Sequence, residues 1–389
     1  MRHFLFAIVL IVLMGCSERP SIYGIIHFPE NSNYQHTVYL IQPQHLNELA
    51  APFFGKVIDS AIIDDQGFFE LKHLPQTSEP MLLEIAIQKQ GDHLNYLQND
   101  DPATNNYMVF VWEKDETIDI TASAAAFQQT FSIENPSPVN TSLLTLREVK
   151  QNSFQKYLQN KHWEVHDGTQ LMEKEEAVLN YQKTLIDFAN NSTQFFPSML
   201  ALRWVSPQND YERVPEFLFQ QCEQWRDYNH PWANELCEKA DKETLPVLVG
   251  DPFPNANLPL STGEITSLYA HLGKKLTIVD VWASWCVPCR KENRDILVPL
   301  WEQYYEKGFQ IIAYGLETSE EAWNTAIEKD GAYRWLHASD LQGDEAAFMK
   351  TLRIQTIPAN FILDAEGKVI AKNLHGADLQ RFVATYFQQ

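Results

Sequence analysis

The sequence has 389 residues, more than the roughly 100 to 200 of a typical domain, so two or three folded units are expected. Hydrophobic side chains make up 44% of the chain and charged ones 21%, a balance typical of globular proteins with packed cores. Its 30 basic and 51 acidic residues give a net charge of -21, which disfavours binding to nucleic acid and to anionic membrane surfaces.

An apolar run from Phe4 to Met14 lies close to the start of the chain. It is shorter than the roughly 20 residues of a membrane-spanning helix and fits the core of a secretory signal, although a short uncut anchor is an alternative. The run ends in Met14-Gly15-Cys16, which resembles the lipobox of bacterial lipoproteins. This resemblance implies that residues 1–15 are a signal peptide and that Cys16 carries lipid. We therefore expect a protein anchored in the cell envelope, facing the periplasm or the exterior.

Short β-rich runs separated by turn residues extend from Ile22 to about Ser123. The candidate strands are Thr37 to Ile41, Val57 to Ile63, Phe68 to Leu71, Met81 to Ile87, Tyr107 to Trp112 and Thr117 to Thr121. Between two of them, Asp64-Asp65-Gln66-Gly67 predicts a hairpin turn in which the glycine takes a positive φ. The pattern predicts a small antiparallel β domain over residues 16–135.

Helical periodicity follows the breaker cluster at Asn135-Pro136-Ser137-Pro138 and predicts a helical region over residues 136–248. Its aromatic residues are expected in the core and not in a ligand site; they include Trp204, Trp225 and Trp232. Cys222, His230 and Cys237 are too few and too loosely spaced for a metal centre. The two cysteines are expected either to form a disulfide or to be buried free thiols.

Strands and helices alternate after Asp251-Pro252-Phe253-Pro254. Strands are predicted at Leu276 to Trp282, Phe309 to Leu316, Asn360 to Leu363 and Lys368 to Ala371, and helices at Pro288 to Tyr305, Glu320 to Glu328, Glu345 to Leu352 and Asp378 to Phe387. Buried strands between amphipathic helices indicate an α/β domain over residues 249–389, with a central sheet covered by helices on both faces.

Cys286 and Cys289 lie in Trp285-Cys286-Val287-Pro288-Cys289, where the first strand of this domain passes into its helix. A thiol at the start of a helix sits at the positive end of the helix dipole, which stabilises its thiolate. Cys286 is therefore the predicted nucleophile, and Cys289 would resolve the mixed disulfide from within. A zinc site would need two more ligands, and no second C-x-x-C or histidine pair follows.

Two further segments surround this motif: Thr277 to Trp285 leads into it, and Thr356-Ile357-Pro358 follows about seventy residues later. Together the three segments resemble the thioredoxin superfamily, and within it the TlpA/ResA-like branch, over Asp251 to Gln389. The β-rich region resembles a domain that often precedes such modules in exported proteins of Bacteroidetes. The resemblance implies a thiol-disulfide oxidoreductase that needs no cofactor and no metal.

The resemblance also implies roles for two acids. Asp280 matches the buried acid of thioredoxins, which handles the proton of the second cysteine, Cys289. Because Asp280 lies in an apolar strand, burial is expected to raise its pKa, as a general base requires. Glu292 matches an acidic residue that this branch places near its active site, although an ordinary solvated helix charge is an equal alternative.

Five residues are expected at the substrate-binding edge: Trp285, Val287, Pro288, Ile357 and Pro358. Pro358 matches the cis-proline of the superfamily, which leaves the neighbouring backbone free to pair with a bound peptide. Pro288 favours a reducing potential. Arg294 stands where the family often has a helix-kinking proline, which predicts a straighter helix.

The leading hypothesis is an enzyme that reduces disulfides of proteins outside the cytoplasm, supplied with electrons by an unidentified membrane donor. A peroxidase is disfavoured because Ala283 occupies the position where its chemistry requires Thr or Ser. The alternative from another class is a partner- or ligand-binding lipoprotein in which the redox domain is secondary.

Overall fold

The computed structural model describes residues 21–75, 77–164 and 168–388. The chain divides into two compact units, one of residues 1–44 with 50–145 and the other of residues 45–49 with 146–389. The predicted signal peptide and Cys16 lie outside the described residues, and the boundaries predicted at 15, 135 and 248 stay predictions. Among the helices described, none combines the length and apolar character that crossing a bilayer requires.

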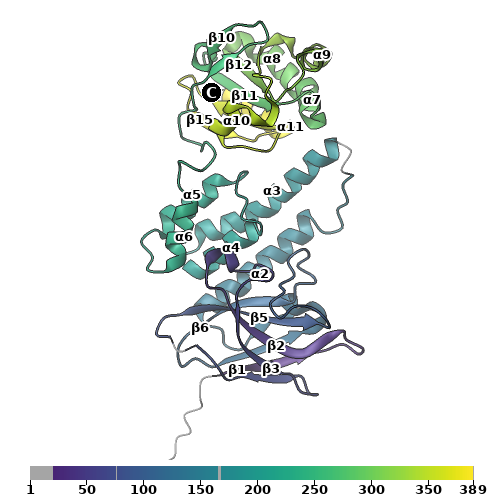
Figure 1. Ribbon diagram of the computed structural model, residues 1–389, viewed down its shortest axis with the longest axis vertical. Helices are drawn as coiled ribbons and strands as arrows, with labels where there is room; N and C mark the ends of the chain where they lie inside the picture. The colour runs from purple at the N-terminus through teal and green to yellow at the C-terminus, as the bar shows by residue number, and fades with distance from the viewer. Residues whose placement is uncertain (1–20, 76, 165–167, 389) are drawn as a thin grey trace, which may run out of the picture. The chain divides into compact units, whose positions relative to one another are not determined.

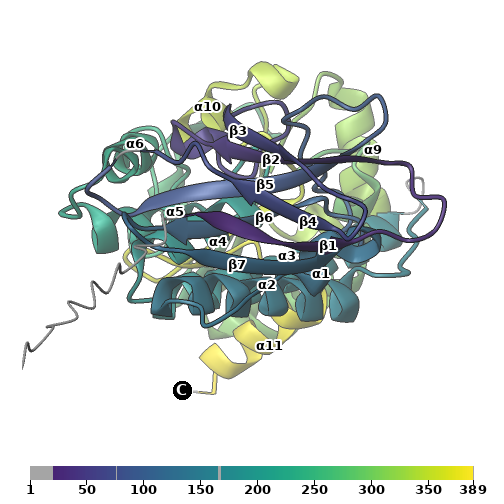
Figure 2. The ribbon, with the colours of Figure 1, turned by 90° about the horizontal axis from the view of Figure 1, so that it is seen from below.

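The first unit contains two four-stranded sheets (Figure 2). One has the order β3-β2-β5-β6 and the other the order β4-β1-β7-β8. Their bounds are β1 Ile22–His27, β2 Tyr34–Gln42, β3 Lys56–Ile62, β4 Phe68–Leu71, β5 Met81–Lys89, β6 Tyr107–Trp112, β7 Ile118–Ser123 and β8 Ser132–Ile133, with a short helix α1 at Phe127–Thr130. The predicted antiparallel β domain is confirmed, except that β1 and β7 pair in parallel. Parallel pairing needs a long connection, which the intervening strands provide.

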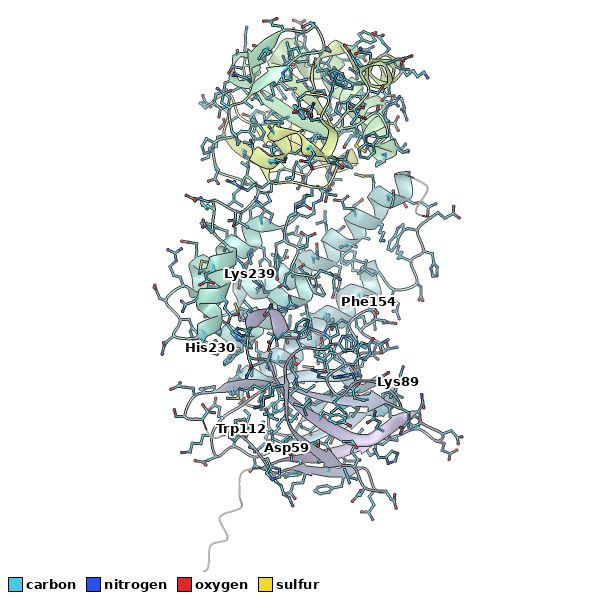
Figure 3. The ribbon with its side chains drawn as sticks, viewed as in Figure 1. Asp59, Lys89, Trp112, Phe154, His230 and Lys239 are labelled. Carbon is cyan, nitrogen blue, oxygen red and sulfur yellow. A yellow bond between two sulfur atoms is a disulfide. The ribbon has the colours of Figure 1, made fainter. Side chains whose placement is uncertain are left out.

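The turn at Asp64–Gly67 differs from its prediction. Asp64 accepts hydrogen bonds from the amides of Gln66 and Phe68, and Gly67 has a φ of 87°. However, β3 and β4 belong to different sheets, so the turn is a connection between sheets and not a hairpin. Asp59 of β3, labelled in Figure 3, also holds the end of β4 by accepting from the amides of Lys72 and His73 at 2.9 Å.

The helical region consists mainly of five helices in the described part of the chain. They are α2 Pro138–Tyr157, α3 Gly168–Asn191, α4 Phe195–Val205, α5 Pro215–Trp225 and α6 Pro231–Lys239. Trp204, Trp225 and Trp232 are all buried, as expected for core residues. Cys222 of α5 and Cys237 of α6 form a disulfide, which decides between the two alternatives left by the sequence.

The C-terminal part has the predicted α/β architecture (Figure 1). Its five-stranded sheet has the order β13-β12-β11-β14-β15, with β11 in the centre. The strands are β9 Asn257–Pro259, β10 Ile265–Ser267, β11 Leu276–Trp282, β12 Phe309–Gly315, β13 Leu336–Ala338, β14 Ala359–Leu363 and β15 Val369–Lys372, and the helices are α7 Val287–Glu292, α8 Val298–Tyr304, α9 Glu320–Asp330, α10 Ala347–Leu352 and α11 Gly376–Tyr386. Strands β11, β12 and β13 run parallel, whereas β14 and β15 pair antiparallel.

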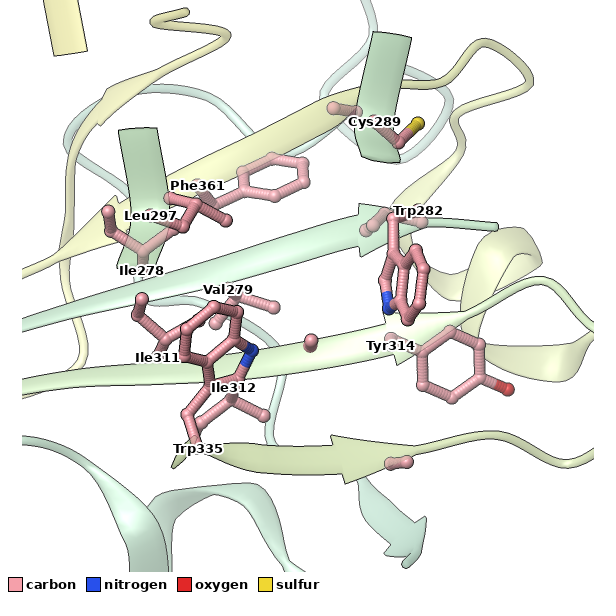
Figure 4. Packing of buried hydrophobic residues seen from close by; sticks show 14 of the residues in the cluster. Ile278, Val279, Trp282, Cys289, Leu297, Ile311, Ile312, Tyr314, Trp335 and Phe361 are labelled. Carbon is pink, nitrogen blue, oxygen red and sulfur yellow. The ribbon is translucent and has the colours of Figure 1, made fainter. Parts of the chain in front are cut away.

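The sheet is buried because its strands carry apolar side chains on both faces. Every residue of β11 is buried, including its one charged side chain, Asp280. Figure 4 shows side chains of β11, β12 and β14 in this core, together with Leu297 and Cys289. The redox motif is therefore attached to a strand that is buried along its whole length.

The helix predicted from Pro288 to Tyr305 is present but is not regular. A π-helical turn at Asn293–Leu297 separates α7 from α8. The prediction of a straighter helix concerns the helix axis and stays a prediction, since this turn is a change of winding. The helix changes its winding where Glu292, Asn293 and Leu297 are all buried, while Arg294 reaches Asp330 at 2.7 Å.

The Cys222–Cys237 disulfide is expected to stabilise the helical region without taking part in redox turnover. It closes a loop over a sequence separation of 15 residues, for which chain entropy predicts a contribution of about 3 kcal/mol. Replacing both cysteines with Ser should therefore lower the urea midpoint of unfolding, while the rate of insulin reduction stays unchanged. A double variant that folds but no longer reduces insulin would contradict this role.

Candidate active site

Cys286 and Cys289 form a disulfide across the first turn of α7, with 5.3 Å between their Cα atoms. Cys286 is the N-cap of this helix, and its Sγ accepts a hydrogen bond from the Cys289 amide at 3.3 Å. The same amide would favour a thiolate at Cys286 after reduction, since it donates toward the place where the charge develops. Cys289 packs into the core of the domain.

The turn between β11 and α7 is held by charged groups on both sides. Glu317, which is 2% exposed, accepts hydrogen bonds from the hydroxyl of Ser284 at 2.7 Å and from its amide. Arg290 donates to the carbonyl of Ser284 at 3.1 Å and forms a two-pronged ion pair with the buried Asp330. These contacts fix the main chain immediately before Trp285 and Cys286.

Asp280 lies in β11, two residues before the end of the strand, and is 4% exposed. Burial raises its pKa well above the usual range of aspartate, and the charge of Glu292 raises it further. Asp280 therefore has the property of a proton acceptor that is protonated more readily than an ordinary carboxylate.

Glu292 is also buried and is not the solvated helix charge that the sequence left open. Its Oε2 lies 2.8 Å from Nδ1 of His375, and its Oε1 accepts from the Gly376 amide at 3.1 Å. The other ring nitrogen of His375, Nε2, is buried and has no hydrogen-bond partner among the described residues. His375 immediately precedes α11, so the start of that helix holds the carboxylate of Glu292.

A cavity of about 540 Å³ borders this pair of side chains. Pro288, Glu292 and His375 line one part of it, and residues of α3 such as Met172 and Glu176 line another. The cavity therefore lies beside the His375–Glu292 pair and next to the redox motif.

Trp285 and Val287 are 63% and 59% exposed and flank the nearly buried Cys286. Large exposed apolar side chains on a soluble domain often mark a contact surface. Val287 also contacts the start of α3, where a Cβ on Gly168 would approach its Cγ1 to 2.7 Å. A side chain at residue 168 would therefore collide with the redox motif.

The structure places Pro358 beside the end of β11. Ala359 pairs with Val281, so Pro358 lies next to the point where β11 ends and the cysteine-bearing turn begins. The Ile357–Pro358 peptide bond is cis.

The structure thus brings the predicted cysteines, both acids and the proline to one end of the central sheet. It adds His375 and Glu317, which sequence reasoning missed. They lie 83 and 33 residues from their partners, and no local pattern marks either of them.

Residues 248–385 match the Redoxin family. The thiol:disulfide interchange protein DsbE of Pseudomonas fluorescens biotype C is 30% identical over 128 residues, which is 31% of this chain and 64% of the relative. A thiol-disulfide oxidoreductase ResA of Bacillus cereus is 30% identical over 133 residues, or 34% of this chain and 72% of the relative. This chain thus matches less than two thirds of the Pseudomonas protein.

Among solved structures, the thioredoxin domain of a thiol-disulfide oxidoreductase from Bacteroides vulgatus is 31% identical, covers 36% of this chain and 99% of its own, and has a TM-score of 0.33. A thiol-disulfide oxidoreductase from Bacteroides fragilis is 30% identical, covers 35% of this chain and 98% of its own, and has a TM-score of 0.32. On the sequence similarity to the ResA proteins, this chain belongs to the TlpA/ResA-like thiol-disulfide oxidoreductases of the thioredoxin superfamily.

Proposed function

We propose that this protein reduces disulfide bonds in protein substrates outside the cytoplasm, using Cys286 and Cys289 as its redox pair. The observation that carries the proposal is the position of the two cysteines. Both cysteines are buried in the oxidised form, but Cys286 is the N-cap of α7 between two exposed apolar side chains, whereas Cys289 lies within the helix. Such an asymmetric pair suits attack by one thiol and resolution by the other.

In the proposed reaction the Cys286 thiolate attacks one sulfur of the substrate disulfide. An S–S bond forms to the substrate while the substrate bond breaks, and the first substrate cysteine leaves as a thiolate that takes up a proton. Cys289 then loses its proton and attacks Cys286, which releases the second substrate cysteine and leaves the Cys286–Cys289 disulfide. A dithiol donor must return two electrons and two protons before the next cycle.

Asp280 is the proposed acceptor of the Cys289 proton, and Glu292, held in place by His375, is the proposed route onward. A proton on Asp280 lies within an apolar sheet, away from bulk solvent that could remove it. The charge of Glu292 acts on Asp280, Glu292 itself lines the cavity of about 540 Å³, and His375 holds its carboxylate. His375 is thus a positioning residue for Glu292.

The proposed location is the cell envelope, with lipid on Cys16 and residues 1–15 removed. The support for it is the apolar run and the lipobox-like sequence at the start of the chain. The proposed partners are protein disulfides as substrates and a membrane protein dithiol as donor. Trp285, Val287, Pro288, Ile357 and Pro358 are the proposed contacts for substrate.

Replacing each cysteine of the pair separately tests the proposed function. Cys289→Ala should accumulate covalent adducts with substrate proteins, because attack proceeds and release is blocked, whereas Cys286→Ala should capture few. Non-reducing electrophoresis of each variant purified from its native host, followed by identification of proteins released by reductant, measures this. Equal trapping by both variants would contradict the assigned roles, and no adducts with either would favour the binding-lipoprotein alternative.

His375 variants test the proton route. His375→Ala should slow release of the second substrate thiol by about tenfold, since Glu292 loses the group that holds it. His375→Asn is the matched control, because its amide can still donate to Glu292 and should restore part of the rate. Stopped-flow measurement of the resolving step separates this from the first attack. A loss confined to the first attack would rule out the assigned role.

Asp280→Asn should increase stability while it slows resolution. Because burial raises the pKa of Asp280, the folded protein binds this proton more tightly than the unfolded chain does. Wild-type stability therefore falls as pH rises from about 4 toward the raised pKa, and the variant escapes this loss. Urea unfolding of the oxidised protein should show a gain at pH 7 that disappears near pH 4.

Asp295→Asn is the control for this experiment, since Asp295 is exposed and pairs with Lys291 at the surface. It should show no comparable gain at pH 7. If Asp280→Asn destabilised the protein at every pH, the carboxylate would have a structural role.

A further inference from the structure

Two charged residues of the helical region contact the loop that precedes Pro358. Glu212 and Arg213 lie just before α5, in the same compact unit as the redox domain. A carboxylate oxygen of Glu212 accepts hydrogen bonds from the amides of Gln355 at 3.0 Å and Thr356 at 2.9 Å. Arg213 donates from Nη2 to the carbonyl of Pro358 at 3.1 Å. The main chain is therefore held on both sides of Ile357.

Arg213 is itself fixed by two further segments. Its Nη1 donates to Oδ1 of Asn373 at 3.2 Å, and its Nε lies 3.0 Å from Oε1 of Glu175 in α3. The guanidinium is planar and donates in fixed directions, so three simultaneous contacts leave it one orientation. The carbonyl of Pro358 thus receives a donor whose place is set by α3 and by the end of β15.

Two further contacts join the helical region to the redox domain. Arg353 donates to the carbonyl of Leu245 at 3.1 Å, and the buried Lys372 lies 2.8 Å from Oε1 of Glu216. The loop from Arg353 to Pro358 therefore has partners in the helical region at its start, its middle and its end. It is not an open loop whose position depends on the redox domain alone.

We propose that Glu212 and Arg213 are positioning residues for polypeptide substrates. They fix the main chain around Ile357 next to the redox turn, so that an extended segment of a substrate protein can pair with it while its disulfide meets Cys286. The inference rests on the proposed function and goes beyond it, because it assigns part of substrate binding to the helical region. It also defines the substrate class: disulfides carried by chain segments that can lie extended, in preference to small disulfides.

Single variants of the full chain test this. Glu212→Ala, which removes the acceptor, and Arg213→Gln should each lower the second-order rate constant of the reduced protein with insulin by about tenfold, since misplacement of a binding group is costly. Their rate constants with 5,5′-dithiobis(2-nitrobenzoate), which has no main chain to bind, should stay close to that of the wild type. The reduction potential of the Cys286–Cys289 pair should also be unchanged. Arg226→Gln is the matched control, because Arg226 pairs with Glu223 on the exposed side of α5.

The outcomes separate the inference from the proposed function. Parallel losses of rate with insulin and with the small disulfide would mean that Glu212 and Arg213 only stabilise the fold. Unchanged rates with both substrates would mean that the contacts do not serve substrate binding. Either result overturns the inference and leaves the proposed function intact. A wild-type protein that reacts with the small disulfide and not with insulin would overturn the proposed function.

Discussion

The redox site depends on a carboxylate that is buried in the middle of an apolar sheet. Strand β11 has a neighbour on each side and every one of its residues is buried, so water has little access to the Asp280 carboxylate. Burying an ionisable group is costly, and the protein meets part of that cost by keeping the group more readily protonated. The arrangement links stability and chemistry, since the burial that lowers the stability of the fold also raises the pKa of the proton acceptor.

Around this acid, the protein fixes the reacting cysteines from several elements at once. Glu317 at the end of β12 holds Ser284, Asp330 at the end of α9 holds Arg290, and His375 before α11 holds Glu292. Each contact joins a group on the strand-to-helix turn or on α7 to a separate part of the domain. Such an arrangement limits movement of the cysteine-bearing turn when its disulfide opens and closes.

Local patterns in the sequence were sufficient for most of the strands and helices and for the residues at the end of β11, but they missed β1 and β13. The paired cysteines, an acid in an apolar strand and a proline before an apolar strand each leave a signal within a few positions. The partners of these residues leave none, because His375 and Arg213 reach their targets across 83 and 145 residues. The same reason explains why the turn at Asp64–Gly67 was predicted as a hairpin but connects two sheets, since strand pairing is decided by residues outside the turn.

The ion pair between Lys372 and Glu216 joins the redox domain to the helical region through a buried charge. Lys372 belongs to β15 and its side chain is 6% exposed, while its partner Glu216 and the Val247 carbonyl that it also contacts come from the preceding helical region. A buried ammonium depends on its carboxylate, so recombination that moved the redox domain alone would carry along a cation without its counter-charge. The helical region is thus more than a spacer in this protein, because it neutralises a charge that the redox domain buries.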